Sequence, residues 1–131
     1  MIKLRAVVLR AVAAVLISAS AIAAAPAADG LSGTSWLGDN GGTRIRFVPC
    51  GSALCGTISW LRDTSGKAKI GQRVFFDLKP SGENQWDGKA FDPDTGKNYT
   101  GSVQISGATL ITKGCVLAGV MCETMNWARA N

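Results

Sequence analysis

The sequence predicts an all-β domain, a small antiparallel up-and-down barrel of about eight strands. Apolar and polar residues alternate with a period of two through most of residues 31–130. Gly, Asn, Asp and Pro recur between the alternating segments, and no stretch of ten residues there has helical periodicity. Successive hairpins with one apolar face form a meander, and a meander of eight strands removes its exposed edges by closing into a barrel. A two-sheet β-sandwich is the alternative.

The first 27 residues predict a Sec-type signal peptide that precedes the fold. A basic segment is followed by an apolar run at 11–25 and by Ala-x-Ala sites. Cleavage after Ala27 is favoured, because the earlier site would leave Pro26 directly behind the cut. The run is shorter than the ~20 residues that a membrane-spanning helix needs, and no cysteine marks a lipoprotein. We expect a periplasmic or secreted protein whose domain, residues 28–131, does not span the membrane.

Removal of this leader lowers the charge of the chain. The sequence carries 14 Lys+Arg and 9 Asp+Glu, and three of the basic residues lie in the leader. The remaining domain has a net charge of about +2 and no run of Lys or Arg. Nucleic acid is therefore not expected as a partner.

The predicted strands follow one another, each separated from the next by a turn. In the second strand, Ile45 and Phe47 alternate with arginines, and in the fourth we expect Val74, Phe76 and Leu78 on one face. The segment 92–97, Asp-Pro-Asp-Thr-Gly-Lys, predicts a tight hairpin turn. The strands are expected at residues 31–37, 43–48, 56–60, 72–79, 85–91, 99–105, 109–114 and 122–130.

Four cysteines follow the leader, and an even number in an oxidising compartment predicts two disulfides. Local pairing, Cys50–Cys55 and Cys115–Cys122, is preferred because each pair brackets a turn between two strand-like segments. A crossed pairing would need the two turns to lie side by side. Each local bridge should stabilise the fold by roughly 2–2.5 kcal/mol. The spacing does not suit a zinc site, and no metal is expected.

The sequence offers little material for catalysis. Without histidine there is no Ser-His or Cys-His couple, and the cysteines are expected to be oxidised. The acidic residues are scattered over turns and polar faces. The segment 92–96 is similar to the start of a calcium loop but lacks its closing Glu. We therefore expect a protein that is not an enzyme and has no cofactor, with a hydrolase as the least favoured reading.

Several segments resemble, in order, the bacterial domain of unknown function 2147 family. They are GTSW at 33–36, RIRFVPCGSALCG at 44–56, ISWL at 58–61, WDGKAFDPDTGKNY at 86–99 and WAR at 127–129. The resemblance implies a small exported protein with a lipocalin-like (calycin) barrel, and it implies no activity. The chain departs from the family pattern in a shorter segment 63–72 and in two residues, not one, between Gly33 and Trp36, where a bulge is expected.

The resemblance also implies a structural role for Trp36 and Arg129. Lipocalin-like barrels commonly pack a tryptophan near the start of the domain on an arginine of the last strand. The guanidinium would stack on the indole and bond carbonyl groups at the closed end of the barrel. Such a contact contributes roughly 1–2 kcal/mol when it is desolvated.

The large residues expected on the apolar faces either fill the barrel or surround a small apolar pocket. Eight strands enclose an interior just wide enough for side chains or for one small ligand. Gly88, Ala90, Gly101 and Gly114 would leave space beside the aromatic rings. We expect a non-enzymatic binder of a small apolar ligand, or alternatively an envelope interaction protein with a filled barrel. The pocket candidates are Trp60, Phe76, Trp86, Tyr99, Met125 and Trp127.

Residues 116–121, from Val116 to Met121, are wholly apolar although they form a turn between two cysteines. If the turn were exposed, it would contact an envelope partner or a membrane. If it folded inward, it would plug one end of the barrel. We expect the plug.

Overall fold

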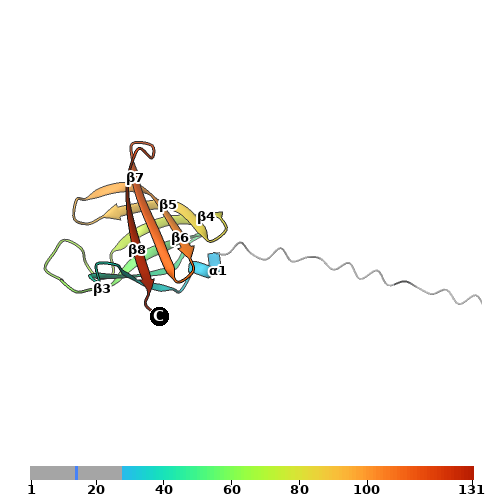
Figure 1. Cartoon of the computed structure of the whole chain (residues 1–131), viewed down its shortest axis with the longest axis horizontal. Coiled ribbons are helices and arrows are strands. Elements are labelled where there is room, and N and C mark those ends of the chain that lie inside the picture. The colour runs from blue at the N-terminus through green and yellow to red at the C-terminus, as the bar shows by residue number, and fades with distance from the viewer. Residues whose placement is uncertain (1–13, 15–27) are drawn as a thin grey trace, which may run out of the picture.

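A computed structural model describes Ala14 and residues 28–131, so the predicted signal peptide lies outside the described residues except for Ala14. Residues 28–131 form a closed antiparallel barrel in which each strand pairs with the next and β8 pairs with β1 (Figure 1). The predicted all-β up-and-down barrel is confirmed, and the sandwich alternative is wrong. The elements are α1 (Ala28–Leu31), β1 (Ser35–Gly38), β2 (Thr43–Cys50), β3 (Ala53–Leu61), β4 (Arg73–Gly82), β5 (Gln85–Asp92), β6 (Lys97–Ser106), β7 (Thr109–Val116) and β8 (Met121–Arg129).

The up-and-down order places alternate turns at opposite ends of the barrel. The turns β2–β3, β4–β5 and β6–β7 lie with α1 at one end, which we call the closed end. The turns at 39–42, 62–72, 93–96 and 117–120 lie at the other, which we call the open end. No helix in the part of the chain that the structure describes is long and apolar enough to cross a membrane.

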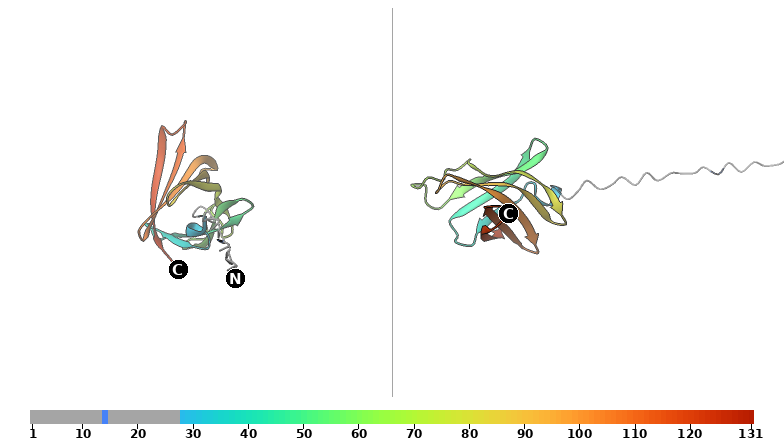
Figure 2. Two further views of the ribbon diagram at one scale, coloured as in Figure 1. Left: turned by 90° about the vertical axis from the view of Figure 1, so that its right-hand side faces the viewer. Right: turned by 90° about the horizontal axis from the view of Figure 1, so that it is seen from above.

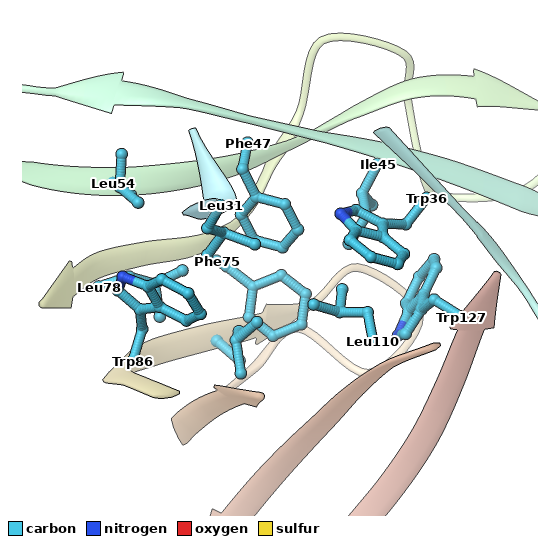
Figure 3. Close-up of a cluster of buried hydrophobic side chains, with 12 residues drawn as sticks. Leu31, Trp36, Ile45, Phe47, Leu54, Phe75, Leu78, Trp86, Leu110 and Trp127 are labelled. Carbon is cyan, nitrogen blue, oxygen red and sulfur yellow. The ribbon is translucent and has the colours of Figure 1, made fainter. Parts of the chain in front are cut away.

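The closed end is filled by the hydrophobic core (Figure 3). Leu31, the last residue of α1, is fully buried in this core. The strand predicted at 31–37 begins only at Ser35, because residues 28–31 are helical. Gly33 separates helix from strand: its φ of 78° is a left-handed conformation that favours glycine, and its N–H donates to the Phe47 carbonyl at 2.7 Å. The side chains buried with Leu31 include Trp36, Phe47, Leu54, Leu78, Trp86, Val103 and Leu110.

Two irregularities in the strand pairing interrupt the predicted alternation and put Trp60 and Phe76 on the outer face, whereas Leu78 is fully buried as predicted. Arg44 pairs with Trp60 but Ile45 pairs with Ile58, so one extra residue, Ser59, bulges out of β3. In β4, the register shifts between Phe76 and Lys79. Asp77 lies in this shift with a left-handed φ of 53°. After each shift the side chains change face.

Both predicted disulfides are present, Cys50–Cys55 and Cys115–Cys122. The first joins β2 to β3 beside the closed end, with Cα atoms 5.6 Å apart. The second joins directly opposed residues of β7 and β8 near the open end, with Cα atoms 4.1 Å apart. Paired cysteines are typical of an oxidising compartment outside the cytoplasm.

Candidate ligand cavity at the open end of the barrel

A cavity of about 590 Å³ lies inside the open end. Its floor is formed by Ile45, Phe75, Thr112 and Trp127, all of which are buried. These residues come from β2, β4, β7 and β8, and together they lie above the filled closed end. The barrel is therefore solid at one end and hollow at the other.

The polar groups of the floor bond one another. The Trp127 Nε1–H donates to the Thr112 hydroxyl oxygen at 2.9 Å, and this hydroxyl donates to the Met125 carbonyl at 3.5 Å. The strongest donor in the floor is thus already satisfied, and the surface offered to a ligand there is mainly apolar.

Three of the six pocket candidates line this cavity, namely Tyr99, Met125 and Trp127. They lie on β6 and β8, where the period-two alternation runs without interruption. Trp86 faces inward but belongs to the closed end, where it is 1% exposed and its Nε1–H has no hydrogen-bond partner. Its assignment to the pocket was wrong because the core covers it completely.

Trp60 and Phe76 lie outside the cavity, and these two assignments were also wrong. The bulge at Ser59 turns the Trp60 ring to the outer face, where it is 37% exposed and the Arg44 guanidinium lies 5.2 Å from the ring centroid. Leu61 takes the inward position instead. Phe76 pairs with Lys89 on the outside of β4, and its neighbour Phe75 reaches the cavity.

The small inward residues have two different functions. Gly114 and Ala90 line the cavity, and a Cβ added at Gly114 would meet the Tyr99 side chain at an ordinary 3.5 Å. At Gly88 a Cβ would lie 2.6 Å from two carbonyl oxygens of β4, and at Gly101 it would lie 2.9 Å from the backbone of β5. These two glycines admit neighbouring backbone and leave no space for a ligand, contrary to expectation.

The rim of the cavity is built by the open-end turns. Arg62 holds the β1–β2 turn, donating from Nη2 to the Asn40 carbonyl at 2.7 Å and from Nε to the Gly41 carbonyl at 3.2 Å. Lys67 reaches from the β3–β4 loop to donate to the Asp94 carbonyl at 3.5 Å. The β3–β4 loop and the β5–β6 turn are thereby joined across one side of the opening.

The acidic residues of the rim have different local roles. The Asp92 carboxylate accepts the Asp94 N–H at 2.9 Å, which is the local bond of a plain hairpin turn. Asp92, Asp94 and Glu123 all line the cavity. Sequence reasoning missed these three, and also Phe75 and Phe91, as lining residues. The sequence places each of them on a predicted strand or, for Asp92 and Asp94, in a turn. It does not indicate which end of the barrel stays hollow.

At the start of the β3–β4 loop, Asp63 is exposed and forms a separate small turn. Its Oδ1 accepts the Ser65 hydroxyl at 2.6 Å and the Ser65 N–H at 2.9 Å. These two hydrogen bonds, the hydroxyl first, lower the pKa of Asp63 from its ordinary value.

The apolar turn at 117–120 does not plug the barrel. Leu117, Val120 and Met121 are 69%, 79% and 60% exposed, and the β7–β8 hairpin projects beyond the other strands (Figures 1 and 2). The plug prediction was wrong because the β7–β8 pairing continues to Val116 and Met121 and carries the tip outward.

The expected contact between Trp36 and Arg129 is present at the closure of the barrel. The two residues pair across β1 and β8, with the guanidinium carbon 5.2 Å from the indole centroid. The buried indole N–H donates to the Thr34 hydroxyl oxygen at 2.7 Å. Among the described residues the Arg129 guanidinium makes no hydrogen bond to a carbonyl, so that part of the expectation was wrong.

Comparison with known proteins gives one family. The model of the family described as "Uncharacterized protein conserved in bacteria (DUF2147)" matches residues 34–129, which is nearly all of the barrel. No curated protein and no solved structure matches the chain.

Proposed function

The chain belongs to the bacterial DUF2147 family, and we propose that this member is a non-enzymatic binder of one small apolar ligand. The observation that carries the proposal is the cavity of about 590 Å³ at the open end. Its volume falls within the roughly 300–1,000 Å³ that is common for small-molecule pockets. Its buried floor has satisfied polar groups and apolar surface, which suits an apolar ligand body.

The side chains favour binding over catalysis. The sequence has no histidine, and all four cysteines are held in disulfides. The carboxylates at the rim therefore have no imidazole or thiol with which to share a proton or form a nucleophile.

The proposed location is the periplasm or the outside of the cell. Two disulfides support an oxidising compartment, and the predicted leader at residues 1–27 supports export. In that setting the protein would hold or carry its ligand outside the cytoplasm.

The test is a fluorescence titration with N-phenyl-1-naphthylamine, a neutral apolar probe. We expect saturable binding of one probe per chain and quenching of tryptophan emission, because Trp127 lies in the cavity floor. Gly114→Leu should reduce binding at least tenfold by filling space beside Tyr99. Ala128→Leu is the control, since it adds an apolar side chain on the exposed face of β8. An absence of saturable binding to the native protein would refute the proposal.

A second candidate function is attachment to an envelope membrane through the hairpin tip. The observation in its favour is the exposure of Leu117, Val120 and Met121 on a turn without charged or polar side chains. Such a tip suits hydrocarbon better than water. The native protein should sediment with phospholipid vesicles, and Leu117→Asp should release it. Ser52→Asp, which adds the same charge at the closed end, should not. Equal sedimentation of the two variants would exclude the tip as the anchor.

A further inference from the structure

We infer that the ligand of the cavity is an organic cation, an amine or quaternary ammonium on an apolar body. This inference rests on the proposed binding function and narrows the class of ligand. It follows from the sign of the charges that line the cavity, the absence of a salt-bridge partner for them among the described residues, and the aromatic rings beneath them.

The charge of the lining is opposite to that of the domain. Residues 28–131 contain eleven Lys and Arg and nine Asp and Glu. The lining contains three of those acids, Asp92, Asp94 and Glu123, and none of the basic residues. A concave site of one sign with low-dielectric walls raises the local concentration of ligands of the opposite sign.

The three carboxylates are not neutralised by the protein. Within the described residues the one salt bridge joins Lys89 and Asp77, 3.9 Å apart on the outside of the barrel. Lys67 approaches the opening, but its amine donates to the Asp94 backbone carbonyl. Across the described chain these carboxylates therefore have no salt-bridge partner, so a bound cation would pair with them, whereas a bound carboxylate would be repelled.

Beneath the rim, three inward-facing aromatic side chains line the cavity: Phe75, Tyr99 and Trp127. The face of an aromatic ring attracts an ammonium group, most strongly where water is excluded. The Trp127 N–H, which could otherwise bind an anion, is already donated to Thr112. The floor thus accepts an apolar body and a cation and provides no charged donor for an anion.

The carboxylates lie at two places on the rim, Asp92 and Asp94 at the β5–β6 turn and Glu123 on β8. In the part of the chain that the structure describes, no three His, Cys, Asp or Glu residues gather closely enough to hold a metal ion. A dispersed negative rim above aromatic rings suits a bulky, diffuse organic charge better than a small divalent ion.

The experiment compares three probes with the same benzyl body. They are benzyltrimethylammonium, its uncharged isostere neopentylbenzene, and phenylacetate, titrated at low ionic strength with tryptophan fluorescence as the readout. We expect the cation to bind about tenfold more tightly than the isostere, and the anion more weakly than either. Added salt should weaken only the binding of the cation.

Two isosteric variants locate the effect. Asp94→Asn and Glu123→Gln should each weaken binding of benzyltrimethylammonium about threefold to tenfold and leave neopentylbenzene unchanged. Asp87→Asn is the matched control, because Asp87 is exposed and lies outside the cavity. It should change neither affinity. Loss of folding is monitored by the thermal melt, and each variant is tested below its own melting range.

The outcomes separate this inference from the proposed function. If N-phenyl-1-naphthylamine binds but the cation binds no better than the isostere, the inference is overturned and the proposed binding of a small apolar ligand is retained. The inference is also overturned if Asp94→Asn and Glu123→Gln both leave cation affinity unchanged. If none of the probes binds, the proposed function fails and the inference fails with it.

Discussion

Gly88→Ala should destabilise the barrel strongly although it adds only one methyl group. The added Cβ would lie 2.6 Å from the carbonyl oxygens of Phe76 and Asp77, closer than van der Waals contact allows. Both obstacles are backbone atoms of the bulge in β4, so no side chain can rotate to relieve them. The bulged strand itself would have to move away from β5, which breaks the pairing on either side of Gly88.

The expected magnitude follows from two opposing terms. Overpacking against fixed backbone costs about 3 kcal/mol, and the loss of glycine freedom in the unfolded chain offsets about 0.7 kcal/mol. The net loss of about 2 kcal/mol should lower the melting temperature of a domain of this size by roughly 10 °C. The assay is thermal and urea unfolding with the disulfides intact, followed by tryptophan fluorescence.

Gly114→Ala is the matched control on the same wall of the barrel. Its Cβ would meet Tyr99 at 3.5 Å, an ordinary contact, so its free energy of unfolding should stay within about 0.5 kcal/mol of native or rise slightly. The reasoning is refuted if Gly88→Ala melts within 2 °C of the native protein, or if the two variants lose the same stability.

Three further predictions concern the second disulfide and two of the open-end turns. Replacing Cys115 and Cys122 by serine should lower the free energy of unfolding by about 2 kcal/mol in urea titrations, and an unchanged midpoint would contradict it. Arg62→Ala should cost about 1 kcal/mol by removing the bonds to the β1–β2 turn. Arg62→Lys should not restore it, because lysine lacks the planar fork; full recovery would disprove the role of the fork. The lowered pKa of Asp63 means that its contribution to stability is present above the unfolded pKa and is lost as the pH falls through the folded one. Ser65→Ala removes the hydroxyl bond and should raise this pKa in an NMR titration, and no change would show that the hydroxyl does not lower it.

The barrel and its two disulfides were predictable because their signals are local. Alternation with a period of two, turn residues between strands, and cysteines on either side of a turn all report on neighbours in the chain. Ile45 and Phe47 were placed inward correctly for this reason, and both are fully buried.

The bulges were not predictable from the same pattern. Phe75 and Phe76 are adjacent and both apolar, so alternation alone cannot choose which one faces inward. The choice is made by Asp77, whose left-handed backbone shifts the strand by one residue. Aspartate tolerates this conformation but does not require it, so its signal in the sequence is weak.

The cavity was less predictable still, because it depends on what several strands leave unfilled. Tyr99, Met125 and Trp127 were expected near a pocket from their faces alone. That Trp86 would be covered, and that Asp94 and Glu123 would border the opening, depends on the position of each residue along the barrel axis. That position is set by the register of all eight strands together.

The filled closed end gives the barrel the form of a cup. Leu31 is fully buried there with Trp36, Phe47, Trp86 and the other core side chains, which together block passage along the axis. A cup exchanges its contents through a single opening, so a ligand must leave by the route by which it entered.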